Sequence, residues 1–212
     1  MSGVGRTPSP VGTSRRVLFV DKDGTLIEDL PYNVDPGRIR LAPGALAGIA
    51  ELGRAGLPLV VVTNQSGVAR GYFEAADLEP VHRHLADIVA SAGAELAGFY
   101  FCPHLPEGVN EFAIECDCRK PLPGLVRRAA AELDLDLARS WFIGDAWMDV
   151  VAGRAAGCRT ILVGPDVRLI PELPAERRPD HAARDFLGAA RIVVGTEPAE
   201  GRSAGMHVEL AR

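Results

Sequence analysis

The stretch VLFVDKDGT, residues 17–25, decides both the fold class and the chemistry expected of this chain. It opens with four apolar residues, a run typical of a short buried strand. Two carboxylates, Asp21 and Asp23, follow where that strand ends. Gly24 then permits a sharp turn, and the Thr25 hydroxyl can fix the loop by hydrogen bonding. We therefore expect a buried strand that carries two acidic side chains into a loop.

The same unit, an apolar run followed by a helical pattern, recurs along the chain. Further strands are predicted at 59–62, 99–101, 141–143 and 161–163. Continuous apolar strands that alternate with helices are typical of a parallel sheet covered on both faces, so we predict a Rossmann-like, doubly wound α/β fold. A helix near 180–190 and a strand at 192–194 are expected to complete it.

Length and composition indicate one soluble domain. The chain has 212 residues, of which 47% are hydrophobic and 24% charged, as in ordinary globular proteins. Residues 16–195 should form the domain, whereas residues 1–15, rich in Gly, Ser, Thr and Pro, should be disordered and residues 196–212 frayed. Neither a long apolar span nor a signal-peptide core is evident, so we expect a cytoplasmic protein that does not associate with membranes.

The charge balance argues against a nucleic-acid partner and draws attention to two lysines. The formal net charge is −5, whereas dedicated nucleic-acid binders usually carry a basic excess. Of 23 basic residues only Lys22 and Lys120 are lysine. In such an arginine-rich chain a retained lysine indicates a site that needs an ammonium group, although chance explains Lys22 equally well. No interface pattern stands out, so we expect a monomer.

Three predicted strands end on a polar side chain: Asp21, Thr63 and Asp145. Ligands of such sheets bind beyond the carboxyl ends of the strands, so these residues should form one site. Buried, charged carboxylates are costly, and Mg²⁺, which prefers oxygen ligands, would compensate them.

The residue types of this site indicate phosphoryl transfer. Asp21 can attack phosphorus and form an aspartyl-phosphate, while Asp23 protonates the leaving alkoxide and later activates water. The Thr63 hydroxyl and the Lys120 ammonium can bind the phosphoryl oxygens. Asp149, one helical turn after Asp145, can orient the lysine. Alone, the DxDGT string also fits a calcium loop or a simple turn, and only the ordered set favours catalysis.

Four motifs carry a family resemblance: DKDGTL (21–26), TNQSG (63–67), RKP (119–121) and GDAWMD (144–149). With them, residues 16–195 resemble the haloacid-dehalogenase-like (HAD-like) phosphatases. The longer strings VVTNQSGVARG (61–71) and CDCRKPLPG (116–124) are similar to the subgroup of D-glycero-D-manno-heptose 1,7-bisphosphate 7-phosphatase and the histidinol-phosphatase domain. The resemblance implies a HAD-like domain without a large cap domain and with a zinc-binding loop at 102–118.

The resemblance also implies roles for individual residues. Magnesium would be held by the Asp21 carboxylate, the Asp23 carbonyl and Asp145. Substrate would contact eight residues, namely Asp29, Tyr32, Thr63, Asn64, Gln65, Ser66, Arg119 and Lys120. Ala146 departs from the family, which has lysine directly after the fourth-motif aspartate, and this puts the preferred sugar anomer in doubt.

Three cysteines and a histidine flank an 11-residue stretch in the predicted loop: Cys102, His104, Cys116 and Cys118. Three thiolates and one imidazole make a closed tetrahedral set typical of structural zinc. The spacing alone is moderate evidence, and the family's zinc loop at this place strengthens it. A disulfide of Cys102 with Cys116 or Cys118 is the alternative, but it leaves His104 unexplained.

Several functions compete for this set of residues. The leading hypothesis is hydrolysis of the 7-phosphate of a heptose bisphosphate, and the alternative is hydrolysis of histidinol phosphate. A polynucleotide 3′-phosphatase is disfavoured by the acidic charge. A non-catalytic, zinc-organised interaction module would be expected to lack the nucleophile or the magnesium aspartate, and this chain retains Asp21 and Asp145.

Overall fold

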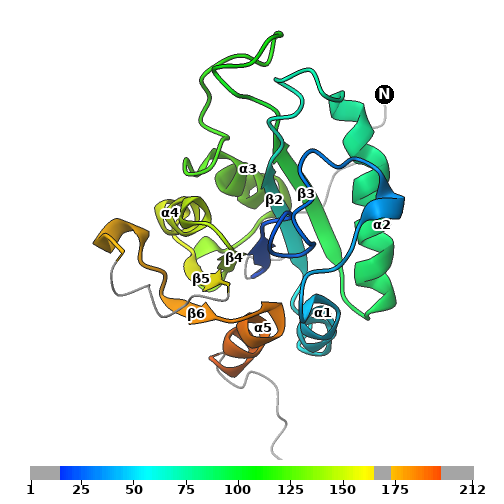
Figure 1. Cartoon of the computed structure of the whole chain (residues 1–212). Coiled ribbons are helices and arrows are strands. Elements are labelled where there is room, and N and C mark those ends of the chain that lie inside the picture. Colours follow the sequence, from blue (N-terminus) through cyan, green and yellow to red (C-terminus); the bar gives the residue numbers. More distant parts are fainter. Residues whose placement is uncertain (1–14, 165–172, 197–212) are drawn as a thin grey trace, which may run out of the picture.

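The computed structural model describes residues 15–164 and 173–196, and a six-stranded parallel sheet forms their centre (Figure 1). The strand order is β3-β2-β1-β4-β5-β6. In chain order the strands are β1 (Leu18–Val20), β2 (Leu59–Asn64), β3 (Leu96–Cys102), β4 (Trp141–Gly144), β5 (Arg159–Val163) and β6 (His181–Ala183). The expected N-terminal extension and C-terminal tail lie, apart from Arg15 and Thr196, outside the described residues.

Within the described ranges, five α-helices cover the two faces of this sheet. They are α1 (Ala45–Arg54), α2 (Leu78–Ser91), α3 (Gly124–Leu133), α4 (Trp147–Ala156) and α5 (Phe186–Gly195). Short 3₁₀ turns lie at Pro36–Arg38, Ala75–Asp77, Leu137–Arg139 and Ala175–Arg177. One hydrophobic core joins the sheet to α1, α2 and α5, and a second core joins the opposite face to α3 and the end of α4 (Figure 1). This arrangement confirms the predicted doubly wound α/β fold.

Strand β1 shows why its sequence is apolar throughout. Leu18 and Val20 contribute to the first core, and Phe19 contributes to the second, because neighbouring side chains point to opposite faces of a sheet. All three side chains are fully buried. The strand pairs with β2 on one side and β4 on the other, so both its edges and both its faces are covered.

The predicted order of the last two elements was wrong. Residues 181–183 form a strand that pairs with β5, and the helix runs from Phe186 to Gly195, so residues 192–194 are helical. The Asp185 side chain accepts a hydrogen bond from the Gly188 N–H (2.8 Å) and caps this helix. Helix α5 packs beside α1 in the first core, and this tertiary packing overrides the strand preference of the β-branched residues.

Strand order reverses at β1, which separates the β2–β3 half of the sheet from the β4–β5–β6 half. In open α/β sheets the carboxyl edge at such a reversal is where ligands bind. The loops that follow β1, β2, β3 and β4 therefore decide the chemistry, and no separate cap domain is evident in the described ranges. None of the described helices is long and apolar enough to cross a membrane.

Candidate active site

Strands β1 and β4 bring three carboxylates together. The backbone N–H of Asp21, the first residue after β1, donates to the carbonyl of Ile143 in β4 (3.0 Å). Asp145 follows β4 directly, and Asp149 lies in the first turn of α4. Carboxylate oxygens of these three aspartates lie within 4.8 Å of one another, as their positions at the carboxyl edge predict.

Lys120 stands between two of these carboxylates. Its Nζ lies 2.8 Å from Oδ1 of Asp21 and 2.6 Å from Oδ1 of Asp149. The lysine side chain is 3% exposed and that of Asp149 is 2% exposed, so water screens this contact little. Burial alone would lower the pKa of Lys120, but the two carboxylates outweigh it and raise the pKa. The lysine is therefore a fixed positive charge beside Asp21.

Asn64 fastens the Lys120 backbone to the sheet. The Asn64 side chain, at the end of β2, donates from Nδ2 to the Lys120 carbonyl (3.1 Å). Its Oδ1 accepts a hydrogen bond from the Lys120 N–H (3.1 Å). This pair of bonds explains how a residue in a long loop is held against the strand ends.

Asp23 is held by partners on both of its oxygens. Lys22 Nζ lies 2.9 Å from one oxygen, and Gln65 Nε2 donates to the other (3.0 Å). The same Gln65 nitrogen lies 3.0 Å from the Thr63 hydroxyl. Gln65 therefore connects the loop after β1 to the end of β2. Burial raises the pKa of Asp23 even though Lys22 opposes the shift. A raised pKa suits a carboxyl group that must alternately donate and accept a proton.

The turn after Asp23 leaves space for the Asp145 carboxylate. Gly24 has φ +79°, and a Cβ at this position would overlap the Asp145 carboxylate. The buried Thr25 hydroxyl donates to Asp145 Oδ1 (3.0 Å). Burial and the nearby Asp21 charge raise the pKa of Asp145, so a cation at this place would offset an unfavourable concentration of negative charge.

A polar cavity of about 260 Å³ opens beside Asp23. Five of the eight predicted substrate residues line it, namely Asp29, Tyr32, Asn64, Gln65 and Ser66. Arg119 does not line this cavity; its Nη1 donates to the His104 carbonyl (3.3 Å), and with Lys120 it lines a second recess of about 340 Å³. Seven of the eight predicted residues therefore line two separate recesses, which the sequence motifs did not indicate, and Thr63 lines neither recess.

The predicted loop ligands Cys102, His104, Cys116 and Cys118 converge on one point. The three sulfur atoms lie 3.1–3.6 Å from one another, longer than the ~2.05 Å of a disulfide bond, and His104 Nδ1 lies 3.2 Å from the Cys118 sulfur. A tetrahedral zinc site with thiolate bonds of ~2.3 Å places its sulfurs ~3.8 Å apart, close to this spacing. The cluster can therefore bind a metal ion.

The loop that carries this cluster also braces the second motif. The Val109 N–H donates to the Ala69 carbonyl (2.8 Å), and Asn110 Nδ2 donates to the Val68 carbonyl (2.7 Å). These contacts could not be predicted from the sequence, because Val109 and Asn110 belong to no motif. They connect the metal-binding loop to the segment that supplies Gln65.

Comparisons with known proteins agree with this geometry. Residues 117–189 match a family model described as HAD-hydrolase-like. The D-glycero-beta-D-manno-heptose-1,7-bisphosphate 7-phosphatase of Escherichia coli strain K12 is 40% identical over 157 residues, which are 73% of this chain and 82% of that protein. The enzyme of the same name from Pseudomonas aeruginosa is 38% identical over 160 residues, 74% of this chain and 86% of that protein. The chain belongs to this family of HAD-like phosphatases.

A solved structure supports the same assignment. The D,D-heptose 1,7-bisphosphate phosphatase of B. bronchiseptica, complexed with magnesium and phosphate, is 32% identical with a TM-score of 0.72. The match covers 85% of this chain and 99% of that chain. In this HAD-like phosphatase the Ala146 backbone N–H donates to Asp149 Oδ2 (3.1 Å). Its side chain is a methyl group and supplies no positive charge to the site.

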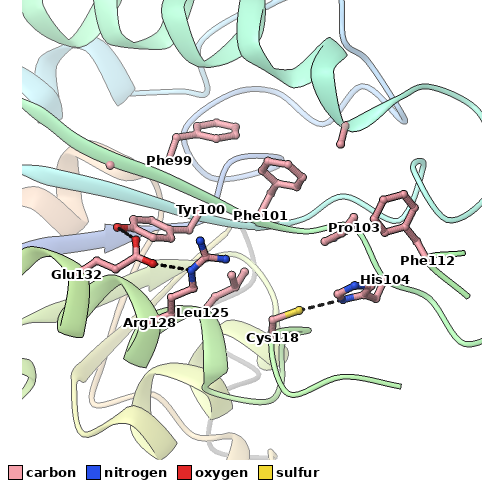
Figure 2. Close-up of a pocket in the computed structure, with 12 residues that line it drawn as sticks. Phe99, Tyr100, Phe101, Pro103, His104, Phe112, Cys118, Leu125, Arg128 and Glu132 are labelled. Carbon is pink, nitrogen blue, oxygen red and sulfur yellow. Dashed lines mark hydrogen bonds and ion pairs between the residues drawn. The ribbon is translucent and has the colours of Figure 1, made fainter. Parts of the chain in front are cut away.

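Not every pocket of this HAD-like phosphatase belongs to the catalytic edge. Figure 2 shows a pocket of about 580 Å³ along β3, walled by Phe99, Phe101 and Phe112. At one end Glu132 accepts hydrogen bonds from Arg128 (2.8 Å) and Tyr100 (2.9 Å). Since these polar groups satisfy one another, the pocket offers no free charge that would mark a phosphate site.

Proposed function

We propose that this chain removes the 7-phosphate of D-glycero-beta-D-manno-heptose 1,7-bisphosphate through an aspartyl-phosphate on Asp21. The observation that carries the chemistry is the buried Lys120 ammonium, 2.8 Å from the Asp21 carboxylate and 2.6 Å from Asp149. It places a fixed positive charge where a phosphoryl group attacked by Asp21 gathers negative charge. The substrate is proposed because relatives of that name align over most of both chains.

The side chains perform the two steps as follows. The ion pair with Lys120 and the Lys22 N–H (2.7 Å) orient the Asp21 carboxylate, whose oxygen attacks phosphorus while the bond to the sugar oxygen breaks. Asp23 donates its proton to the leaving sugar oxygen. In the second step Asp23 takes a proton from water, which attacks the aspartyl-phosphate and releases inorganic phosphate. The hydrogen bond from Gln65 keeps Asp23 directed at the reacting atoms in both steps.

The donor sets fit two metals. Asp21, Asp145 and the carbonyl of Asp23 would hold Mg²⁺, since Asp149 is already neutralised by Lys120. Bound there, the ion would supply positive charge for the phosphoryl oxygens. Cys102, His104, Cys116 and Cys118 would hold structural Zn²⁺, because three thiolates and one imidazole that converge on one point make a closed tetrahedral ligand set.

The substrate assignment predicts a ranking of kcat/KM. The polar lining of the 260 Å³ cavity suits a polyhydroxylated sugar, so we expect the beta heptose bisphosphate to exceed histidinol phosphate by roughly tenfold or more. Measuring released phosphate for both heptose bisphosphate anomers and for histidinol phosphate tests this. A tenfold preference for histidinol phosphate would remove the sugar proposal. The same measurement shows which of the two anomers this chain prefers.

The zinc assignment predicts a matched pair of cysteine variants. We expect about one zinc per purified chain, and expect Cys118→Ser to lose most of it and to lower the melting temperature by at least ~5 °C. Cys158→Ser is the control, because Cys158 is buried outside the cluster and should leave the zinc content unchanged. Metal content is measured by mass spectrometry and stability by calorimetry. Equal zinc content in both variants would contradict the assignment.

A further inference from the structure

Two exposed tyrosines from different loops meet at the rim of the cavity beside Asp23. Tyr32 follows β1 and lines the cavity, whereas Tyr72 follows β2 and does not line it. Their ring centroids are 4.7 Å apart with an interplanar angle of 82°, an edge-to-face contact. This geometry is favourable because the positive edge of one ring faces the negative face of the other.

The backbone of Tyr32 is held by a turn of its own loop, whereas its side chain is exposed. Its φ is +57°, and among the described non-glycine residues only Asp134 shares a positive φ. The Asn33 N–H donates to the Leu30 carbonyl (3.1 Å), and this turn, with Pro31 before Tyr32, holds the backbone in that conformation. The Tyr32 side chain is 46% exposed, so core packing does not fix the orientation of its ring. The contact with the Tyr72 ring can fix that orientation.

The backbone of Tyr72 is likewise held by hydrogen bonds within its own turn. Its N–H donates to the Gly67 carbonyl (2.9 Å), and the Gly71 N–H donates to the Val68 carbonyl (3.0 Å). The Phe73 ring packs so closely against Gly67 that a Cβ there would overlap it. The Tyr72 ring is therefore presented from the same turn that carries the cavity residues Gln65 and Ser66, although it is itself 60% exposed.

We propose that Tyr72 is a positioning residue that holds Tyr32 over the cavity and thereby selects for sugar phosphates over small phosphate esters. The Tyr32 ring offers an apolar face to the C–H groups of a sugar, while the Asp29 carboxylate and Ser66 hydroxyl offer polar partners to its hydroxyls. The inference rests on the proposed sugar-phosphatase function and adds the residue that shapes its recognition. Tyr72 does not line the cavity itself and would act through the Tyr32 ring.

The test compares Tyr72→Ala and Tyr72→Phe with the parent on heptose bisphosphate and on p-nitrophenyl phosphate, which carries no sugar. We expect Tyr72→Ala to raise KM for heptose bisphosphate about fivefold to tenfold with kcat largely kept. The kcat/KM ratio of the sugar over the small ester should fall by a similar factor. Tyr72→Phe keeps the ring and should restore the ratio. Leu46→Ala, which removes an equally exposed apolar side chain from α1, is the control.

The outcomes separate this inference from the proposed function. An equal loss on both substrates, no loss on either, or Tyr72→Phe as weak as Tyr72→Ala would each overturn the role of the Tyr72 ring. If the parent fails to hydrolyse heptose bisphosphate, the proposed function fails. The same ratio measured with histidinol phosphate then decides the role of Tyr72, since a fall in the ratio supports it and an unchanged ratio rejects it.

Discussion

Asp21→Asn is expected to lower phosphatase kcat by on the order of 10³-fold or more while the chain stays folded. An amide nitrogen and a neutral carbonyl cannot replace a carboxylate as the attacking group. The side chain is nearly isosteric and 14% exposed, so its replacement opens no cavity in either hydrophobic core. Phosphate release from p-nitrophenyl phosphate at saturating magnesium measures the loss.

The control for this prediction is Asp87→Asn, which removes the same charge from an exposed position on α2. We expect it to retain parental activity. An Asp21→Asn protein as active as the parent would exclude the aspartyl-phosphate mechanism altogether. Equal loss in both variants would indicate a general charge effect rather than a lost nucleophile.

The sequence predicted that Asp21, Thr63 and Asp145 share one edge of the sheet, because each of the three follows an apolar run. Asp21, Thr63 and Asp145 stand at strand ends, and strand ends of a parallel sheet share one edge whatever the strand order. The strand order itself, and the reversal at β1, required the structure. The last strand and helix were predicted in the wrong order because a helix that packs on a neighbouring helix can contain β-branched residues, as Val193 in α5 does.

Contacts that join separate loops could not be predicted. No local pattern indicates that Asn64 bonds the Lys120 backbone, or that Asn110 bonds the Val68 carbonyl. Such contacts depend on loop conformation, and each involves residues at least 42 positions apart. They nevertheless decide the site, because they fix the loop from which the Lys120 ammonium reaches Asp21.

Both lysines of the chain are buried and pair with an aspartate after β1, which favours the ammonium interpretation for Lys22 over chance. Lys22 is 1% exposed and pairs with Asp23, and Lys120 is 3% exposed and pairs with Asp21. Composition provided a usable signal here because arginine fills the other 21 basic positions. A compact ammonium can sit beside a buried carboxylate where the broad, planar guanidinium group would need more space.

Lys120→Met is expected to damage stability and catalysis by separable amounts. Removing the ammonium leaves Asp149 buried without its charge partner, at a cost of about 3–5 kcal/mol, or roughly 10 °C in melting temperature. The kcat should fall by on the order of 10²–10³-fold, because the charge beside the phosphoryl oxygens is lost as well. Calorimetry and phosphate release measure the two effects on the same protein.

The double variant Lys120→Met/Asp149→Asn then distinguishes the two functions of the lysine. Neutralising the buried carboxylate should recover more than half of the lost stability, since an amide tolerates burial better than an unpaired charge. Activity should stay as low as in the single variant, because Asp21 still lacks the neighbouring ammonium. If activity returns together with stability, Lys120 serves only to neutralise Asp149, and the charge-stabilising step assigned to it is wrong.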